Sequence, residues 1–323
     1  MKYDKTVLVT GGAGFIGSNY LNFAVPEYPN YQFINLDALT YAAKLNNVHI
    51  EKLPNYLFVE ADIRDANKLA EIFDKHCPTH IIHFAAESHV DNSISAPGIF
   101  IETNVIGTHN LLNLAKLRNI KRFHQISTDE VYGSLSLDAP ASTEADHLLP
   151  NSPYSASKAS ADLLVRAYHE TFGLDTIVTR ASNNYGSNQY PEKLIPLFIS
   201  KLLSGKKVPL YGNGENVRDW IHVSDHVLGI DRAFHDGKSG EIYNLGGGNE
   251  IMNIDITKKL ISLAGRSEAD AIEHVADRLG HDIRYALDSS KAERDLHWKP
   301  LKNFEEEIAK TFEFYSKSVQ NEG

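Results

Sequence analysis

Cysteine is almost absent from this sequence, since Cys77 is the only one among 323 residues. A single thiol excludes a disulfide within the chain and a metal cage built from cysteines. Long apolar runs are lacking too: none approaches the roughly 20 residues of a membrane-spanning helix, and the apolar stretch at 6–10 is too short for the core of a signal peptide. These absences predict a cytoplasmic protein without a membrane partner.

Positively charged residues are fewer than negatively charged ones. Lysine and arginine number 32 against 42 aspartates and glutamates, which leaves a net charge of −10. Such a surface repels a polyanion, so we expect no nucleic-acid partner. The 15 histidines show no metal-ligand spacing such as HExxH, and we expect no metal site.

Short β-rich runs alternate with longer helical patterns through the first half of the chain. Strands are expected at 6–10, 31–36, 56–59, 80–84, 123–127 and 175–179, and helices at 100–117 and 154–172. This rhythm predicts a Rossmann-type, doubly wound α/β fold with a parallel sheet. After about residue 184, prolines and glycines interrupt the pattern. We therefore expect a first domain at 1–183, to which about 222–250 returns, and a smaller mixed α/β lobe at 184–323.

A glycine-rich turn follows the first expected strand. Gly11, Gly14 and Gly17 have a spacing that lets the N–H groups of a helix N-terminus approach a pyrophosphate. Asp37 ends the second strand, 20 residues after Gly17, where a carboxylate can accept hydrogen bonds from a ribose. The alternative is a helix-packing turn with an unrelated surface aspartate. Together the two features favour NAD, because Asp37 would repel the 2′-phosphate of NADP.

Two further strands end in residues that could reach a ligand at the carboxyl edge of the sheet. Asp62 closes the third strand, and the run Phe84-Ala85-Ala86-Glu87-Ser88 closes the fourth. A plainer alternative for Asp62 is the N-cap of a helix over 64–73.

Candidate proton-transfer groups follow the fifth strand. Tyr154 and Lys158 stand four residues apart at a helix start and so share one face. A neighbouring ammonium stabilises a phenolate and makes a tyrosine useful as a base, although a half-buried tyrosine beside a solvated lysine is the alternative. Asp129 and Glu130 are adjacent carboxyls whose repulsion and burial can hold one protonated and the other ionised. Their alternative is a pair of solvated loop charges.

These motifs together resemble the extended short-chain dehydrogenase/reductase family, whose members act mostly on nucleotide sugars. The triplet Thr128-Asp129-Glu130 resembles that of the dTDP-glucose 4,6-dehydratases within it, as do the segments 85–91, 181–186, 191–196 and 277–282. The resemblance covers residues 7 to about 285. Three positions, none of them expected to be catalytic, depart from the family pattern of lysine, arginine and proline: Ala38, Asn92 and Leu279.

The resemblance implies a reaction of dTDP-glucose with NAD. Oxidation at carbon 4, with proton loss to Tyr154, would acidify the hydrogen on carbon 5. Glu130 would take that proton while Asp129 protonates the hydroxyl that leaves carbon 6. Hydride return to carbon 6 would then give dTDP-4-keto-6-deoxyglucose and regenerate NAD. Thr128 would hydrogen-bond the sugar near carbon 4, and Lys158 would assist Tyr154.

The resemblance also implies binding residues for both ligands. Cofactor contacts are expected from Gly11, Gly14, Phe15, Ile16, Gly17, Asp37, Thr40, Asp62, Ile63, Phe84, Ala85, Ala86, Thr103, Tyr154, Lys158 and Asn184. Nucleotide-sugar contacts, mainly from the second lobe, are expected from Ser88, Thr128, Asn183, Lys193, Leu194, Pro209, Tyr211, Arg218, Asn253, Asp277, Arg278 and His281. Arg218 is the candidate for a phosphate, because a guanidinium fork suits bidentate contacts.

A homodimer is implied as well, in which the helices at 100–117 and 155–172 of two copies pair as a four-helix bundle. The product would enter deoxysugar synthesis, such as the rhamnose pathway, for polysaccharides. Two enzymatic alternatives are a UDP-sugar 4-epimerase and a UDP-glucose 4,6-dehydratase. A third, a non-catalytic NAD-binding sensor, is disfavoured because it would need neither Tyr154 nor the acid pair.

The first prediction concerns cofactor choice. Because Asp37 would place a negative charge against a 2′-phosphate, NAD should bind more tightly than NADP. Titration of the purified protein with each dinucleotide measures the two affinities. Tighter binding of NADP would contradict the role given to Asp37.

Overall fold

Seven parallel strands form the main sheet of this protein. The structure is a computed structural model, and it describes residues 3–321. Their order across the sheet is β10-β6-β5-β4-β1-β2-β3, so the winding reverses beside β1. The bounds are β1 (Lys5–Thr10), β2 (Tyr31–Asp37), β3 (Tyr56–Glu60), β4 (His80–His83), β5 (Arg122–Thr128), β6 (Thr176–Ala181) and β10 (Ile242–Leu245). This arrangement confirms the Rossmann-type fold predicted from the sequence, and β10 adds a strand beyond the six expected ones.

Alternation along the strands explains why the sheet is buried on both faces. In β1, Val7 and Val9 belong to one core cluster and Leu8 to the other. In β2, Phe33 and Ile34 divide in the same way. Successive side chains of a strand point to opposite faces, so these apolar runs need helices on both sides.

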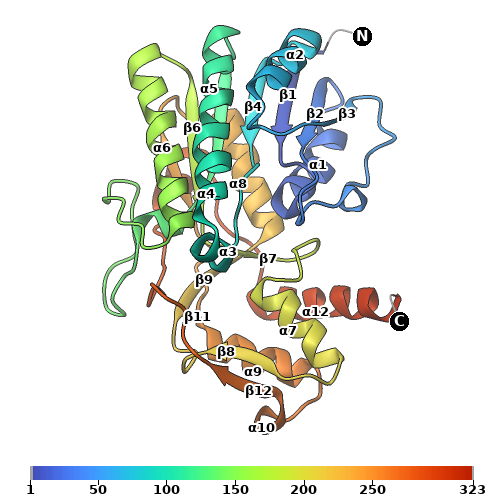
Figure 1. The fold of residues 1–323 in the computed structure, drawn as a ribbon, viewed down its shortest axis with the longest axis vertical. Helices are drawn as coiled ribbons and strands as arrows, with labels where there is room; N and C mark the ends of the chain where they lie inside the picture. Colours follow the sequence, from blue (N-terminus) through green and yellow to red (C-terminus); the bar gives the residue numbers. More distant parts are fainter. Residues whose placement is uncertain (1–2, 322–323) are drawn as a thin grey trace.

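Two helical layers supply that cover (Figure 1). The first contains α1 (Phe15–Glu27), α8 (Val223–Asp236) and α11 (Ser290–Leu296), whose apolar residues share one cluster. The second contains α2 (Ala66–His76), α5 (Thr108–Leu117) and α6 (Pro153–Phe172), which share the other. The segment that includes α8 and β10 therefore packs with the main sheet although it follows part of the second lobe in the chain.

The start of α6 is fixed by its own sequence. The side chain of Ser152 accepts from the backbone N–H of Ser155, and the Ser155 hydroxyl accepts from the N–H of Ser152, which forms a capping box. Pro153 occupies the first turn, and Gly173 ends the helix with φ of 69°. These caps set the position of the first turn, in which Tyr154 lies.

The helix expected at 100–117 is divided in the structure. A short α4 (Pro97–Phe100) passes into a π-helical segment, η2 (Ile101–Gly107), before α5 begins. Gly107 permits this close packing, because a Cβ there would lie 2.6 Å from Cδ1 of Ile63. Asn104 in the wide turn donates to the carbonyl of Glu87 and to the hydroxyl of Ser157. The π-helical segment thus links the end of β4 to α6.

The second lobe has two small sheets and its own core, below the main sheet in Figure 1. One sheet contains β7 (Asn183–Tyr185), β9 (Val217–His222) and β11 (Glu250–Met252), and the other contains β8 (Val208–Tyr211) and β12 (Ile272–Val275). The main helices of the lobe are α7 (Leu194–Leu203), α9 (Asn253–Leu263) and α12 (Phe304–Asn321). The remaining short elements are η1 (Leu45–Asn47), α3 (Val90–Ser95), η3 (Asp129–Tyr132) and α10 (Glu268–Ala271). Among the described residues, no helix is both long and apolar enough to cross a membrane.

The core of the second lobe provides a stability prediction. Leu260 on α9 is fully buried, whereas Leu263 on the same helix is 36% exposed. Replacing Leu260 by Ala removes buried methyl groups and leaves a cavity, which should lower the free energy of unfolding by about 2–5 kcal/mol. Urea unfolding measures the change. Leu263→Ala is the matched control, and an equal loss in both variants would contradict the packing described here.

Candidate active site

A cavity of about 320 Å³ opens at the carboxyl edge of the main sheet. The glycine turn after β1 and the ends of β2, β3, β4 and β5 form one wall, and the 189–193 loop before α7 forms another. Open α/β sheets bind ligands at this edge, beside the strand where the winding reverses. Every residue expected to contact the cofactor lines this cavity.

The glycine turn is shaped for close backbone approach. Gly11 has φ of +72°, and a Cβ there would lie 2.6 Å from the backbone nitrogen of Ala85. A Cβ at Gly17 would lie 2.3 Å from the carbonyl oxygen of Gly11. Larger residues at these two positions would push the turn away from the start of α1, so the glycines keep the helix N-terminus open toward the cavity.

Asp37 lies buried at the end of β2 and lines the cavity. Its two oxygens accept hydrogen bonds from the backbone N–H groups of Ala13 and Leu39, both at 2.9 Å. Burial raises the pKa of the carboxyl, and these two hydrogen bonds oppose that effect. Each carboxylate oxygen still has capacity to accept from a ribose hydroxyl.

The plainer role considered for Asp62 does not hold, because α2 begins later than expected. Asp65 is the N-cap, and its side chain accepts from the N–H of Lys68 at 2.9 Å. Asp62 instead lines the cavity and pairs with Arg64, whose Nη2 lies 2.6 Å from Oδ2. Arg64 also lines the cavity, although the sequence had not marked it as a site residue.

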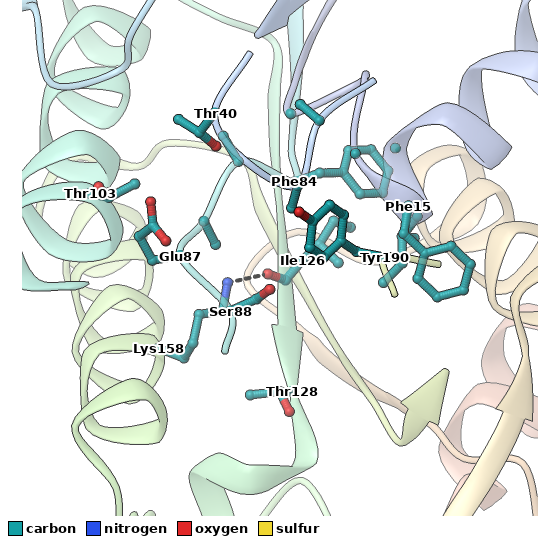
Figure 2. A pocket seen from close by; sticks show the side chains of 18 of the residues that line it. Phe15, Thr40, Phe84, Glu87, Ser88, Thr103, Ile126, Thr128, Lys158 and Tyr190 are labelled. Carbon is teal, nitrogen blue, oxygen red and sulfur yellow. Dashed lines mark hydrogen bonds between the residues drawn. The ribbon is translucent and has the colours of Figure 1, made fainter. Parts of the chain in front are cut away.

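All five expected catalytic residues face the same cavity. Thr128 ends β5, Asp129 and Glu130 form the start of η3, and Tyr154 and Lys158 lie on the first turns of α6. Figure 2 shows Lys158 and Thr128 from these two elements, together with Ser88 from the segment that follows β4. The end of β5 and the capped start of α6 therefore bring the five expected catalytic residues together.

Neighbouring charges distinguish the pKa values of the two carboxyls of the acid pair. Asp129 is 3% exposed, and its Oδ2 has no hydrogen-bond partner among the described residues. Burial, followed by the charges of Glu130 and Asp219, raises the pKa of Asp129 well above its usual range. Burial also raises the pKa of Glu130, but the positive charges of Arg218 and Lys193 oppose it. Asp129 is consequently the group that keeps its proton, and Glu130 is the one that ionises more readily.

Lys158 binds a backbone carbonyl oxygen, a contact that the sequence analysis had not predicted. Lys158 Nζ donates to the carbonyl oxygen of Ile126 at 2.6 Å, the dashed contact in Figure 2. Burial lowers the pKa of Lys158 to about 8. The pKa of Tyr154 is raised by burial and then by the charge of Glu130, against an opposing hydrogen bond with Thr128. Without a ligand, therefore, the phenol remains protonated at neutral pH.

The expected nucleotide-sugar residues fall into two groups. Ser88, Thr128, Asn183 and Lys193 line the cavity, and Lys193 Nζ donates to the carbonyl oxygen of Ser88 at 2.8 Å. The others lie outside its lining, in the second lobe or the 277–281 segment: Leu194, Pro209, Tyr211, Arg218, Asn253, Asp277, Arg278 and His281.

Four members of the second group nevertheless contact one another, and two of them bind Asp91. Arg278 Nε lies 2.6 Å from Asp91 Oδ1, and the Tyr211 hydroxyl donates to Oδ2 at 3.3 Å. The rings of Tyr211 and His281 meet edge to face, and His281 Nδ1 lies 2.6 Å from Oδ1 of Asp277. A cluster of aromatic and cationic groups thus lies next to the cavity, held by a carboxylate that the sequence had not marked as a site residue.

Arg218 is buried in β9 and has a constrained guanidinium. Nη2 donates to the carbonyl oxygen of Asp282 at 3.0 Å, and the group lies over the ring of Tyr285 at 4.4 Å. Its positive charge acts to lower the pKa of both carboxyls of the acid pair. Arg218 is therefore placed to favour the ionised form of Glu130.

Several cavity residues were not assigned a contact by the sequence analysis. They include Glu87, Gln189, Tyr190, Glu192 and His226. Glu87 belongs to the run after β4 that was expected to reach a ligand, but no ligand contact was assigned to it. The loop residues carry no comparable signal. Two of them are held by Tyr41, whose hydroxyl donates to Glu192 at 3.2 Å and whose ring meets that of Tyr190 edge to face.

A Rossmann sheet whose glycine turn and tyrosine–lysine pair line one cavity defines an enzyme of the extended short-chain dehydrogenase/reductase class. The family described as GDP-mannose 4,6 dehydratase matches residues 8–311. The chain is 46% identical to a dTDP-glucose 4,6-dehydratase from Salmonella typhimurium over 97% of its own length and 93% of the relative. The chain therefore belongs to this nucleotide-sugar dehydratase family, and the family predicted from its sequence is confirmed.

Solved structures agree with this assignment. A dTDP-glucose 4,6-dehydratase from Streptomyces venezuelae, solved with NAD bound, has a TM-score of 0.93 and 48% identity, with 98% of both chains covered. The UDP-glucose 4-epimerase of Thermotoga maritima has a TM-score of 0.89 at 31% identity, covering 97% of this chain and 99% of the epimerase. The fold is thus shared by both reaction types.

The raised pKa of Asp129 predicts a pH-dependent stability difference. A carboxyl whose pKa is higher in the folded state than in the unfolded state destabilises the fold as pH rises above the unfolded value of about 3.9. Asp129→Asn has no charge to bury. Its free energy of unfolding should therefore exceed that of the parent by an amount that grows from about pH 4 upward, and that reaches ~1.4 kcal/mol for each unit by which the folded-state pKa of Asp129 exceeds the unfolded one. Urea unfolding at a series of pH values measures this.

Asp236→Asn is the control for that series, since the Asp236 side chain is 51% exposed. It should show no comparable trend. A difference between parent and Asp129→Asn that stays constant with pH would contradict the buried, protonated Asp129.

Proposed function

We propose that this protein is an NAD-dependent hydro-lyase that converts dTDP-glucose to dTDP-4-keto-6-deoxyglucose and water. The observation that carries the proposal is the buried acid pair, in which Asp129 favours the protonated form while cations lie near Glu130. Relatives that are 44–48% identical over nearly their whole length bear the name of this activity. A dehydratase needs both an acid and a base beyond its tyrosine, and these two residues supply them.

The cavity fits NAD on its own geometry. The close approach at Gly11 and Gly17 leaves room for a pyrophosphate at the start of α1, and Asp37 can accept from a ribose. We assign cofactor binding to the residues expected from the sequence, because they surround one continuous space. When bound, NAD would accept a hydride from the sugar and later return it.

The roles of the protein groups follow from their positions. Tyr154 would first lose its own proton, when the bound ligands and the Lys158 ammonium favour the phenolate, and the phenolate would then accept the proton of the carbon 4 hydroxyl, which Thr128 orients. Glu130 then removes the proton on carbon 5, and Asp129 gives its own proton to the hydroxyl that leaves carbon 6. The two carboxyls must therefore differ in protonation state, as the surroundings of Asp129 and Glu130 favour.

The nucleotide half of the substrate is assigned to the second lobe. Tyr211 and His281 offer faces for a base, and Arg218, Lys193 and Arg278 offer positive charge for a diphosphate. Leu194, Pro209, Asn253 and Asp277 are proposed to complete this half. We divide the chain into a cofactor domain, 1–183 with about 222–250, and a mainly nucleotide-sugar-binding domain, 184–323, because β10 and α8 pack with the main sheet. The division had not anticipated α11, which also packs with the main sheet.

A homodimer is part of the proposal. The outer surfaces of η2, α5 and α6 expose large apolar side chains, namely Ile101, Ile106, Leu117, Leu163 and Phe172. Two such helix pairs could cover each other as a four-helix bundle. We further propose a cytoplasmic enzyme that feeds deoxysugar synthesis of the rhamnose type.

A 4-epimerase is the second candidate, since an epimerase shares this fold. Oxidation and re-reduction at carbon 4 require Tyr154 but neither Asp129 nor Glu130. Incubating the protein with dTDP-glucose and UDP-glucose, followed by alkali to reveal a 4-keto product, distinguishes the two nucleotides. In heavy water a dehydratase places deuterium on carbon 5, whereas a simple epimerase places none on carbon.

Glu130→Gln should separate the two half-reactions. The amide cannot accept the carbon 5 proton, so the enzyme should oxidise the sugar and then stall, with NADH absorbance rising and little 4-keto-6-deoxy product released. Tyr154→Phe is the matched variant that should stop earlier, without NADH formation. Elimination by Glu130→Gln at a rate near the parent's would overturn the proposed mechanism.

A further inference from the structure

A buried ion pair lies behind the acid pair. Arg180 on β6 donates through Nε to Oδ2 of Asp162 on α6 at 2.9 Å, and both side chains are 3% exposed or less. Removing two charges from water costs several kcal/mol per ion, so a buried pair is weak evidence of stabilisation by itself. Its hydrogen-bond partners indicate what else it does.

The ion pair holds both ends of the segment that carries the acid and the base. On one side, Ser127 Oγ donates to Oδ2 of Asp162 at 3.0 Å. On the other, Arg180 Nη1 donates to the hydroxyl oxygen of Tyr132 at 2.8 Å, and that hydroxyl donates to Asn244 Oδ1 at 2.8 Å. Ser127 immediately precedes Thr128, and Tyr132 is the last residue of η3. The four residues between them include Asp129 and Glu130.

The same pair is connected to the helix of the tyrosine and the lysine. Asp162 follows Lys158 by four residues on α6, and its negative charge opposes the lowering of the Lys158 pKa by burial. The guanidinium of Arg180 also lies 4.8 Å from the ring centre of Tyr132, so the ring and the hydroxyl are both held. The strand, the short turn of the acid pair and the catalytic helix thus meet at one charged contact.

We propose that Ser127, Tyr132, Asp162 and Arg180 are positioning residues that hold Asp129 and Glu130 in register with Tyr154 and Lys158. The inference rests on the proposed function, because elimination is the step that uses the acid pair. A displacement of about 1 Å at a reacting group can cost about 100-fold in rate. Loosening one end of this segment should therefore slow elimination more than it slows oxidation at carbon 4.

Tyr132→Phe tests the inference with a small change. It keeps the ring over Arg180 and removes the hydroxyl that joins Arg180 to Asn244. We expect elimination to slow by about 10- to 100-fold while KM and the rate of NADH formation in a single turnover stay within about twofold of the parent's. Bound NADH should accumulate, and its absorbance is a signal that general loss of folded protein would not produce.

Tyr243→Phe is the matched control. Tyr243 is fully buried in β10, and its hydroxyl accepts from the N–H of Lys238, away from the acid pair. It should leave the ratio of the two steps unchanged. Ser127→Ala loosens the other end of the segment and should reproduce the effect of Tyr132→Phe, so that poor folding of one variant does not decide the test.

Equal slowing of both steps in the two loosened variants, or slowing of neither, would overturn the positioning role while leaving the dehydratase intact. A parent protein that makes no 4-keto product from either nucleotide sugar would instead overturn the proposed function, and this inference with it. The parent assay therefore distinguishes the two failures.

Discussion

All seven strands of the main sheet run in one direction, and the site depends on that constraint. Parallel strands place their carboxyl ends on one edge, so the segments that leave β1, β2, β4 and β5 open toward the same space. Segments distant in the chain, the glycine turn and the acid pair among them, thereby become neighbours. The helices that cover both faces leave this edge free for loops and for the second lobe.

Desolvation then decides the chemistry within the site. The same burial that favours the proton on Asp129 disfavours the proton on Lys158. Local charges modify the outcome at each group: Glu130 lies near Arg218 and Lys193, whereas Asp129 lies near two other carboxyls. One buried environment can thus prepare an acid and a base side by side.

Much of this architecture could be predicted from local patterns in the sequence. Short β-rich runs located the six expected strands, and the spacing of Gly11, Gly14 and Gly17 located the cavity because it reflects a single turn. The start of α6 was similarly readable, since its capping serines and Pro153 lie within four residues. Such features depend on neighbours in the chain.

Contacts between distant residues were not predictable in the same way. Asp162 and Arg180 lie on different elements, and nothing in their own surroundings marks them as partners. Asp91 with Arg278, and Tyr41 with Glu192, are pairs of the same kind. The π-helical segment was missed because the apolar pattern at 100–117 also fits an ordinary helix, and the contacts of Asn104 in the wide turn are with distant residues.

The cavity has walls from both lobes, which connects occupancy of the site to the stability of the whole chain. A molecule that binds there and not to the unfolded chain stabilises the folded state by mass action, by about 2.7 kcal/mol when its free concentration is ~100 times its Kd. Because Gly11 and Lys193 face the same space from different lobes, neither lobe can unfold while the site stays complete. The melting temperature of this protein is therefore a property of the protein together with its ligand concentration, rather than of the polypeptide alone.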